Sequence, residues 1–531
     1  MSAARPDIAV RAVRWTGEAA RRAEIDGSWR LAERLYSDAL DLIDEEDLTP
    51  RFDILIGRSR VRAESWEERG ALDDATAALA IAERIADPRS SARSRARALL
   101  RRATALARSG HIEQADTELK EAIGIFDDVG DLQGRADALR ERGLASLLRS
   151  DTRRAEAPIA EALDAFRALG DRRGEAWSLQ NLAWIALVDG RLDHADAFVA
   201  DSEVAFRALG DPGGLAWAQG LAAFARLERG DLGAAADIAG RILRECERRG
   251  DRFGEAMMLT VLAHVELWRG HTTAAAASAE QAVSAFRSSP DLAGTVGLEQ
   301  ALSVAGRAEI MAGNPDRGLA LLDEAITSAL STADGGSFAS GVSLVTAVQV
   351  GRPDPLLDLP VERWLGAAGA ARAPLHEATY ALGLAQVGRV EEALAFARNA
   401  LHGAPEHGYV LSVLALVSSS AGLVDEAVAA AEQLDQSPTA TYLDRVWADI
   451  AVAVSDPGDR GRRYLEQAEV DLGVAEDVVA AGLLDLTRQI RRDRAAGRLD
   501  PRAVDTLSSD AGLSDSLWGA MLVAAADRAA V

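Results

Sequence analysis

The sequence predicts an all-α protein, an α-solenoid built of helical hairpins. Three observations support this fold class: a large apolar residue recurs every 40 residues, a Gly-Asp pair recurs with the same step, and only 5% of the residues are aromatic in a chain rich in helix-forming alanine. A fixed period of about 20 to 50 residues is typical of a repeat array. The recurring large residues are Phe126, Phe166, Phe206 and Phe286, and Cys246 stands where the 40-residue step would place another phenylalanine. The Gly-Asp pairs begin at Gly130, Gly170, Gly210 and Gly250.

Each period is expected to form two helices joined by a turn. In residues 171–210, Asp171 is placed to cap the first helix, Gly190 lies in the turn, and Gly210 ends the second helix. The second helix carries apolar residues at helical spacing. Counting such periods predicts about eight hairpins before residue 330.

The 40-residue spacing does not continue after residue 330. The following stretch is rich in Gly, Ser and Pro, which predicts an irregular linker or hinge. Beyond it, Gly388 and Gly422 are 34 residues apart, so the array is expected to resume with shorter repeats. We therefore expect two solenoid segments in a chain of four parts: 40-residue repeats at 1–330, the linker at 331–372, 34-residue repeats at 373–475 and capping helices at 476–531.

Pairs of small residues stand 12 positions apart in most periods. They are Ala103/Ala115, Gly143/Ala155, Ala183/Ala195, Ala223/Ala235, Ala263/Ala275, Ala381/Ala393 and Ala415/Ala427. In this spacing the chain resembles the tetratricopeptide repeat, in which two small residues mark the contact of helix A with helix B. The resemblance implies a right-handed superhelix whose concave wall is built mainly from first helices. The long repeats depart from the family's 34-residue form and resemble its 40- to 42-residue variants.

The N-terminal third carries a second, narrower resemblance. Residues 9–43 and 51–85 are similar to the helical region that follows the ATPase module in large bacterial regulators, including regulators with nucleotide-cyclase domains. In those proteins the region is a sensing or partner-binding arm. The ATPase and cyclase modules have no counterpart here, so the resemblance implies no catalytic residue.

Charge and composition disfavour several classes of partner. The net charge of -24 opposes binding to nucleic acid or to anionic lipid, because both require a cationic surface. Cys246 is the only cysteine and cannot form an internal disulfide. The sequence shows no long apolar span and no signal peptide, so we expect a cytoplasmic protein.

The chemistry of several enzyme classes is also disfavoured. Lys120 is the only lysine and lies in a helical stretch without a Gly-rich loop, which argues against a P-loop, a protein kinase or pyridoxal phosphate chemistry. His402 and His407 could approach one another across a loop, but no cysteine joins them and the chain has no HExxH pattern, which disfavours a metal site. We expect no cofactor, no metal and no enzymatic activity.

One face of the first helices is rich in aromatic and amide side chains. At about 100° per residue, this face lies opposite the packing face. Aromatic rings supply contact area and amides bind backbone groups, so the face is a candidate groove for a peptide. The alternative is that it packs between hairpins, as aromatic stripes at helical spacing commonly do. Its members are Trp177, Gln180, Asn181 and Trp184 in one period and, in the next two, Trp217, Phe224, Met257 and His264.

Toward the N-terminus the corresponding face is rich in arginine. It carries Arg97, Arg101 and Arg108, with Arg140 on the neighbouring repeat. Guanidinium groups pair bidentately with carboxylates and phosphates, which makes this face a candidate site for an acidic peptide or a phosphate. The alternative is a solvated face neutralised by the many carboxylates of the chain.

The sequence therefore predicts a non-enzymatic scaffold that binds a protein or peptide in its concave groove. A second hypothesis is a sensory arm of a bacterial signalling or transcription regulator, which captures a small ligand or controls an ATPase partner. Genes that encode such a partner nearby would favour the second hypothesis.

Overall fold

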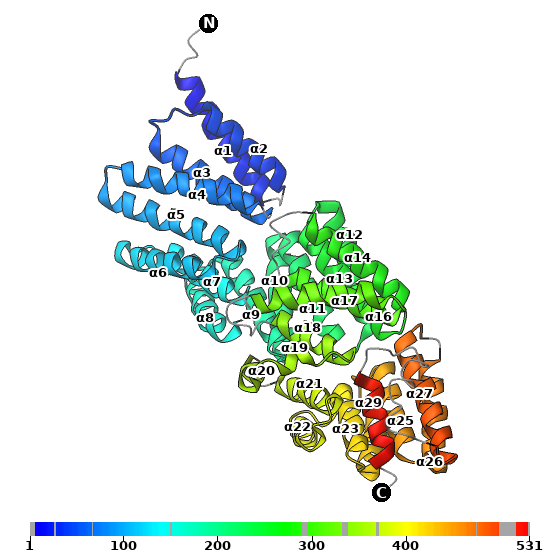
Figure 1. Ribbon diagram of the computed structural model, residues 1–531. Helices are drawn as coiled ribbons and strands as arrows, with labels where there is room; N and C mark the ends of the chain where they lie inside the picture. Colours follow the sequence, from blue (N-terminus) through cyan, green and yellow to red (C-terminus); the bar gives the residue numbers. More distant parts are fainter. Residues whose placement is uncertain are drawn as a thin grey trace.

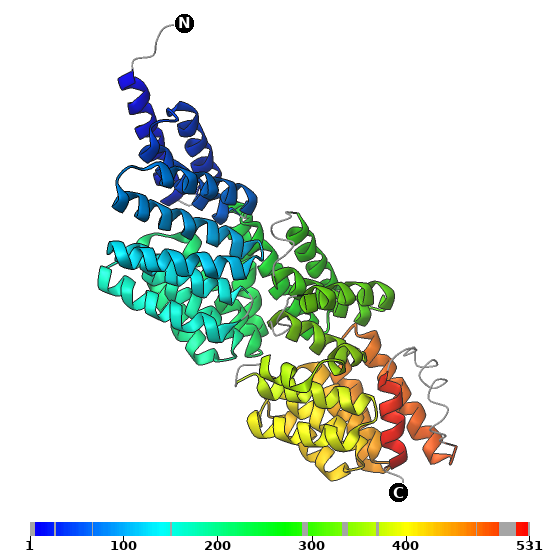
Figure 2. The same cartoon turned by 60° about the vertical axis from the view of Figure 1, so that its left-hand side comes forward.

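The computed structural model is helical in every described part of the chain (Figure 1). It describes residues 6–25, 28–65, 67–148, 151–288, 296–331, 338–367, 371–473, 475–498 and 517–528. These ranges hold 27 helices and no strand, so the all-α prediction is confirmed. Figures 1 and 2 show an elongated molecule with its two termini at opposite ends.

Eight hairpins precede residue 332 within the described ranges, as the repeat count predicts. Their helices are α1 (Pro6–Ile25), α2 (Trp29–Leu42), α3 (Leu48–Glu64), α4 (Glu68–Arg84), α5 (Pro88–Arg108), α6 (Ile112–Val129), α7 (Leu132–Leu147), α8 (Thr152–Leu169), α9 (Arg172–Val188), α10 (Leu192–Leu209), α11 (Pro212–Glu228), α12 (Leu232–Arg249), α13 (Arg252–Trp268), α14 (Thr272–Arg287), α16 (Val296–Met311) and α17 (Pro315–Ser331).

The later helices are shorter on average and continue the stack. They are α18 (Phe338–Gln349), α19 (Asp354–Leu357), α20 (Val361–Ala367), α21 (Ala373–Gln386), α22 (Val390–Gly403), α23 (Gly408–Ser420), α24 (Val424–Leu434), α25 (Tyr442–Ser455), α26 (Asp459–Leu472), α27 (Val478–Ala495) and α29 (Leu517–Arg528).

The recurring Gly-Asp pair forms the joint between hairpins. Gly170 ends α8 with a φ of 72°, a left-handed conformation that glycine adopts without steric cost. Asp171 then caps α9, because its side chain accepts the backbone N–H of Gly174 at 3.0 Å. Since the same pattern recurs at each 40-residue step, the pair sets the length of the repeat.

The phenylalanine ladder forms the contact between one hairpin and the next. Phe166 is fully buried, and a Cβ added to Gly174 at the start of α9 would lie closer than 3.0 Å to its ring. Cys246 occupies the same position in its repeat, is 3% exposed and faces Gly254. The prediction that Cys246 is a packing residue is confirmed.

The stretch expected as a linker contains three helices in its described part. Leu344 and Val348 on α18 and Trp364 on α20 are buried in the same hydrophobic core as α13, α16 and α21–α27. The core therefore runs through this region, although the division of the chain into four parts stays a prediction.

The turns of the 40-residue repeats contact the loops of the later repeats. The positive φ of Gly190, Gly230 and Gly270 makes the turns, and their missing side chains allow close approach. A Cβ on Gly230 would lie 2.9 Å from the carbonyl oxygen of Pro438. The backbone N–H of Glu476 donates to the carbonyl oxygen of Gly270 at 2.8 Å. We call these contacts the array junction.

Candidate peptide-binding surface

The first row of the aromatic face consists of Trp177, Trp217 and Met257. Its two tryptophans pack onto phenylalanine rings between hairpins. Trp177 on α9 meets Phe206 edge to face, with ring centroids 5.1 Å apart. Trp217 on α11 stacks on Phe253, with centroids 5.4 Å apart. These tryptophans and Met257 on α13 are all half-buried. Each side chain therefore supports the core and still keeps contact with solvent.

The second row of the aromatic face consists of Trp184, Phe224 and His264, and it connects neighbouring first helices. Trp184 and Phe224 are half-buried and both pack against the hydrophobic cluster around Leu221. His264 is also half-buried, and its Nδ1 lies 2.9 Å from the carbonyl oxygen of Thr260. Burial lowers the pKa of His264, which favours the neutral ring at physiological pH.

The two amides of the aromatic face lie deeper than the rings. Gln180 is 2% exposed and Asn181 is 3% exposed. The Asn181 Nδ2–H donates to Gln180 Oε1 at 3.0 Å. Within the described residues, Asn181 Oδ1 has no hydrogen-bond partner. A buried acceptor without a donor costs about 1–3 kcal/mol, so an N–H group that reached this oxygen would recover part of that cost.

The structure thus brings the predicted aromatic face together on three adjacent first helices, α9, α11 and α13. It shows that the face contributes to packing between hairpins, which was the alternative interpretation. Its half-burial leaves the rings accessible to a ligand as well. The binding role of these residues remains a prediction.

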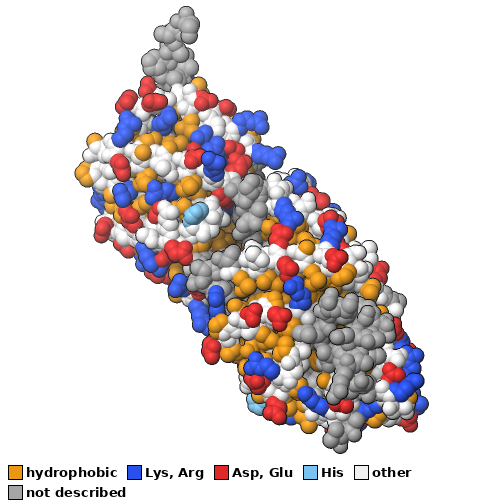
Figure 3. All heavy atoms as spheres, in the orientation of Figure 1, with side chains coloured by type: hydrophobic (Ala, Val, Ile, Leu, Met, Phe, Trp, Pro, Cys, Tyr) orange, Lys and Arg blue, Asp and Glu red, His pale blue; other side chains and the backbone are white. Residues whose placement is uncertain are grey.

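Three of the four predicted arginines have partners within the chain. Arg97 pairs with Asp53 at 2.9 Å, Arg108 donates to the carbonyl oxygen of Ala63, and Arg140 pairs with Glu141. Arg101 differs: in the described part of the chain it makes neither a hydrogen bond nor an ion pair. Figure 3 shows basic and acidic side chains interspersed over the visible face, which is consistent with extensive pairing elsewhere on the surface.

Solved structures share this fold, whereas no family model and no curated protein matches the sequence. A Rap protein complexed with Competence and Sporulation Factor is 12% identical, covers 67% of this chain and 98% of its own, and gives a TM-score of 0.52. NprR in complex with its cognate peptide NprX is 15% identical over 68% of this chain and 98% of that one, with a TM-score of 0.48. Cut9 in the APC/C hetero-tetramer Cut9-Hcn1 is 12% identical over 97% of this chain and 96% of that one, with a TM-score of 0.44.

The chain is a tetratricopeptide-like helical repeat protein. Its helical hairpins and the similarity to the Rap protein confirm the fold that the 12-residue spacing of small side chains predicted. At this level of identity the similarity concerns the fold alone.

In this tetratricopeptide-like protein, Arg60 was not among the arginines predicted from the sequence. This side chain lies on α3, 41 residues before Arg101, so the step of about 40 residues would have placed both on the same face. Arg60 donates to Glu24 Oε2 at 2.8 Å.

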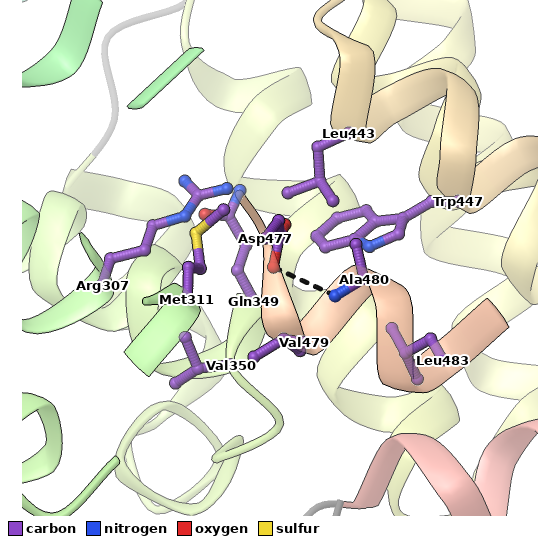
Figure 4. Close-up of a pocket in the computed structure, with 10 residues that line it drawn as sticks. All are labelled: Arg307, Met311, Gln349, Val350, Leu443, Trp447, Asp477, Val479, Ala480 and Leu483. Atoms are coloured by element: carbon purple, nitrogen blue, oxygen red, sulfur yellow. Dashed lines mark hydrogen bonds between the residues drawn. The ribbon is translucent and has the colours of Figure 1, made fainter. Parts of the chain in front are cut away.

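A pocket between α16, α18, α25 and α27 was also missed (Figure 4). Figure 4 shows Arg307 and Gln349 extending toward Asp477 at the start of α27. The cavity of about 20 Å³ has room for about one water. Burial lowers the pKa of Arg307, whereas burial raises the pKa of Asp477. The spacing between Gly270 and Gly313 departs from the 40-residue step, so the repeat pattern did not predict which residues lie together here.

The described ranges also bear on metal sites and membrane-spanning helices. No group of three or more His, Cys, Asp or Glu side chains is placed to hold a metal ion among the described residues. None of the described helices combines the length and the apolar character needed to cross a bilayer.

Proposed function

We propose that this tetratricopeptide-like protein is a non-enzymatic scaffold that binds a peptide, free or within a protein, along the aromatic face of α9, α11 and α13. The observation that carries the proposal is the partial exposure of this face. The ladder ring Phe206 is fully buried, whereas Trp177, Trp184 and Trp217 keep contact with solvent. Rings that only filled the core would be as fully buried as the repeated phenylalanines, such as Phe206.

The chemistry of the face fits an extended chain. Aromatic rings supply most of the binding free energy in many interfaces, and a buried amide without a full set of partners can bind a peptide group. The Rap protein similar in fold is complexed with Competence and Sporulation Factor, which supports a binding role for this architecture. A sensory arm of a regulator would use the same face, and that hypothesis stays a prediction.

The proposal is tested with a soluble library of seven-residue peptides. The library is incubated with the full-length protein, and retained peptides are identified by mass spectrometry after size exclusion. We expect the wild type to enrich a subset of peptides and the Trp177→Ala/Trp184→Ala variant to bind that subset at least about tenfold more weakly, as loss of aromatic anchors commonly does.

The matched control is Trp15→Ala. Trp15 lies on α1, outside the aromatic face, and is 63% exposed. It removes an indole without touching the proposed site, so its peptide enrichment should equal that of the wild type. Circular dichroism shows whether the double variant stays folded, and Trp184→Phe retains an aromatic ring if it does not. Equal enrichment by wild type and folded double variant would exclude this face as the binding site.

A further inference from the structure

Three arginines from successive first helices converge on one place in the array. Arg60 lies on α3, Arg101 on α5 and Arg140 on α7, at spacings of 41 and 39 residues. Helix α5 contacts both α3 and α7. The pKa of the Arg101 guanidinium is lowered, first by burial and then by the positive charge of Arg60. Glu141 and Asp137 raise this pKa and Arg140 lowers it, so charges of both signs lie near the Arg101 guanidinium.

The carboxylates that form ion pairs in this cluster do so with the outer two arginines, and Glu141 acts on Arg101 only through its charge. Arg60 donates to Glu24 at 2.8 Å, and Arg140 pairs with Glu141. Glu141 also accepts the hydroxyl of Thr104 at 3.3 Å. Among the described residues, Arg101 is left without a hydrogen bond or an ion pair.

The remaining carboxyl group near Arg101 is that of Asp137, and it does not act as an ion-pair partner of Arg101 among the described residues. Asp137 on α7 is close enough to feel the charge of Arg101, yet no ion pair joins the two among the described residues. Burial raises the pKa of Asp137 more than Arg101 and Arg140 lower it. Arg101 as a residue is half-buried, so part of it reaches solvent. Because Arg101 lies near two other arginines and has no ion-pair partner of its own among the described residues, it favours an added anion.

We infer that Arg101 anchors an anionic group of the ligand, and that this group is a carboxylate of the bound peptide. The inference rests on the proposed function, since it places the carboxylate on the same array of first helices as the aromatic face. One carboxylate is favoured over a string of acidic residues, because the protein as a whole carries a net charge of -24.

The length of the ligand follows from the spacing of helices. Packed helices lie about 8–10 Å apart, so α5 and α9, with α7 between them, are separated by about 20 Å. An extended chain covers about 3.3 Å per residue, and about six residues span that distance. A seven-residue peptide can therefore place an acidic residue at Arg101 and an apolar side chain at Trp177.

The test uses two seven-residue peptide libraries that differ at one kind of residue. Every member of the first library carries one Asp, and the second library has Asn at the same position. We expect the wild type to retain peptides of the Asp library at least about tenfold more strongly than their Asn partners, the discrimination expected of a charge-assisted hydrogen-bonded pair. Arg101→Gln should remove that preference while still retaining Asn peptides. Arg101→Lys should keep part of it.

The control variant is Arg95→Gln on the same helix. Arg95 already pairs with Glu121 at 2.7 Å, and its side chain is 43% exposed, so its loss should leave the Asp preference intact. An Asp preference that survives Arg101→Gln, or equal retention of the two libraries by the wild type, overturns the inference.

A separate measurement with inorganic phosphate distinguishes this inference from the proposed function. If neither library is retained, peptide binding is wrong. In that case, a rise in the wild-type unfolding temperature with phosphate that is absent in Arg101→Gln would retain Arg101 as the site of a free anion. If phosphate stabilises both proteins equally or neither, and no library is retained, the anion site is also wrong.

Discussion

The guanidinium of Arg372 pairs with the carboxylate of Glu228 at 3.1 Å, and this ion pair joins the start of α21 to the end of α11. The same guanidinium donates to the carbonyl oxygens of Val188 at 2.8 Å and Leu187 at 3.2 Å at the end of α9. One side chain thus donates to two carbonyl groups at the end of α9 and holds two first helices of the long array against the later repeats.

Arg372→Ala should loosen the array junction. The substitution leaves Glu228 without this partner and removes the donor to two helix-end carbonyls, and we expect it to cost about 2–4 kcal/mol in local stability. Hydrogen exchange measures the effect as faster exchange at the ends of α9 and α11 and the start of α21. Arg389→Ala, which removes a surface pair with Glu392, is the control and should change little. Equal exchange in both variants would mean that the other contacts of the junction hold it without Arg372.

Two glycine substitutions should have opposite effects. A methyl group at Gly174 would lie closer than 3.0 Å to the buried ring of Phe166, so Gly174→Ala is expected to destabilise the protein by about 1–3 kcal/mol. Gly124 lies within α6 with no atom within 4 Å of an added Cβ, so Gly124→Ala should stabilise it by about 0.5–1 kcal/mol. Urea denaturation followed by circular dichroism compares the two. An unchanged free energy of unfolding in Gly174→Ala would show that the ring of Phe166 can shift.

The thiol of Cys246 should be unreactive in the folded protein. Burial raises its pKa to about 12, and the side chain is 3% exposed. The reactive thiolate is therefore scarce and shielded at pH 8. Labelling with iodoacetamide should be slow in buffer and rapid in denaturant, with intact mass spectrometry as the readout. Rapid labelling of the native protein would indicate that α12 opens readily.

His376 should make the start of α21 sensitive to acid. Its ring stacks on Trp364 with centroids 4.0 Å apart, and burial lowers its pKa to about 4. The unfolded state binds the proton first, near pH 6.5, so the stabilising contribution is complete above about pH 6.5 and is lost as pH falls toward 4. The expected loss over this window is roughly 2–4 kcal/mol.

The measurement for His376 is a difference between two proteins. Burial raises the pKa of Glu299 to about 7 and that of Asp449 to about 8, and protonation of these groups acts in the opposite direction. Thermal unfolding of wild type and His376→Gln from pH 7.5 to 4.5 cancels their effect. The wild type should lose stability more steeply than the variant as pH falls. Parallel curves would contradict the lowered pKa of His376.

The repeat architecture could be predicted because its signals are local. Gly170 and Asp171 act within one turn of chain, through a positive φ and a cap, and they recur with each repeat. Phe166 and Gly174 are eight residues apart and meet directly. Helical periodicity likewise placed the aromatic face on consecutive first helices. These features depend on short-range sequence, so the pattern revealed them before any contact between distant segments was considered.

The partners of individual side chains depended on tertiary structure. Arg97 and Arg101 are indistinguishable in the sequence pattern, yet Arg97 meets Asp53 of the preceding hairpin and Arg101 meets no partner among the described residues. The contact of Arg372 with Glu228 joins residues separated by 144 positions. By itself, the sequence determined the helical hairpins and their period. The stacking of the hairpins decided which charges are neutralised and where the arrays join, because both depend on groups that only the folded chain brings together.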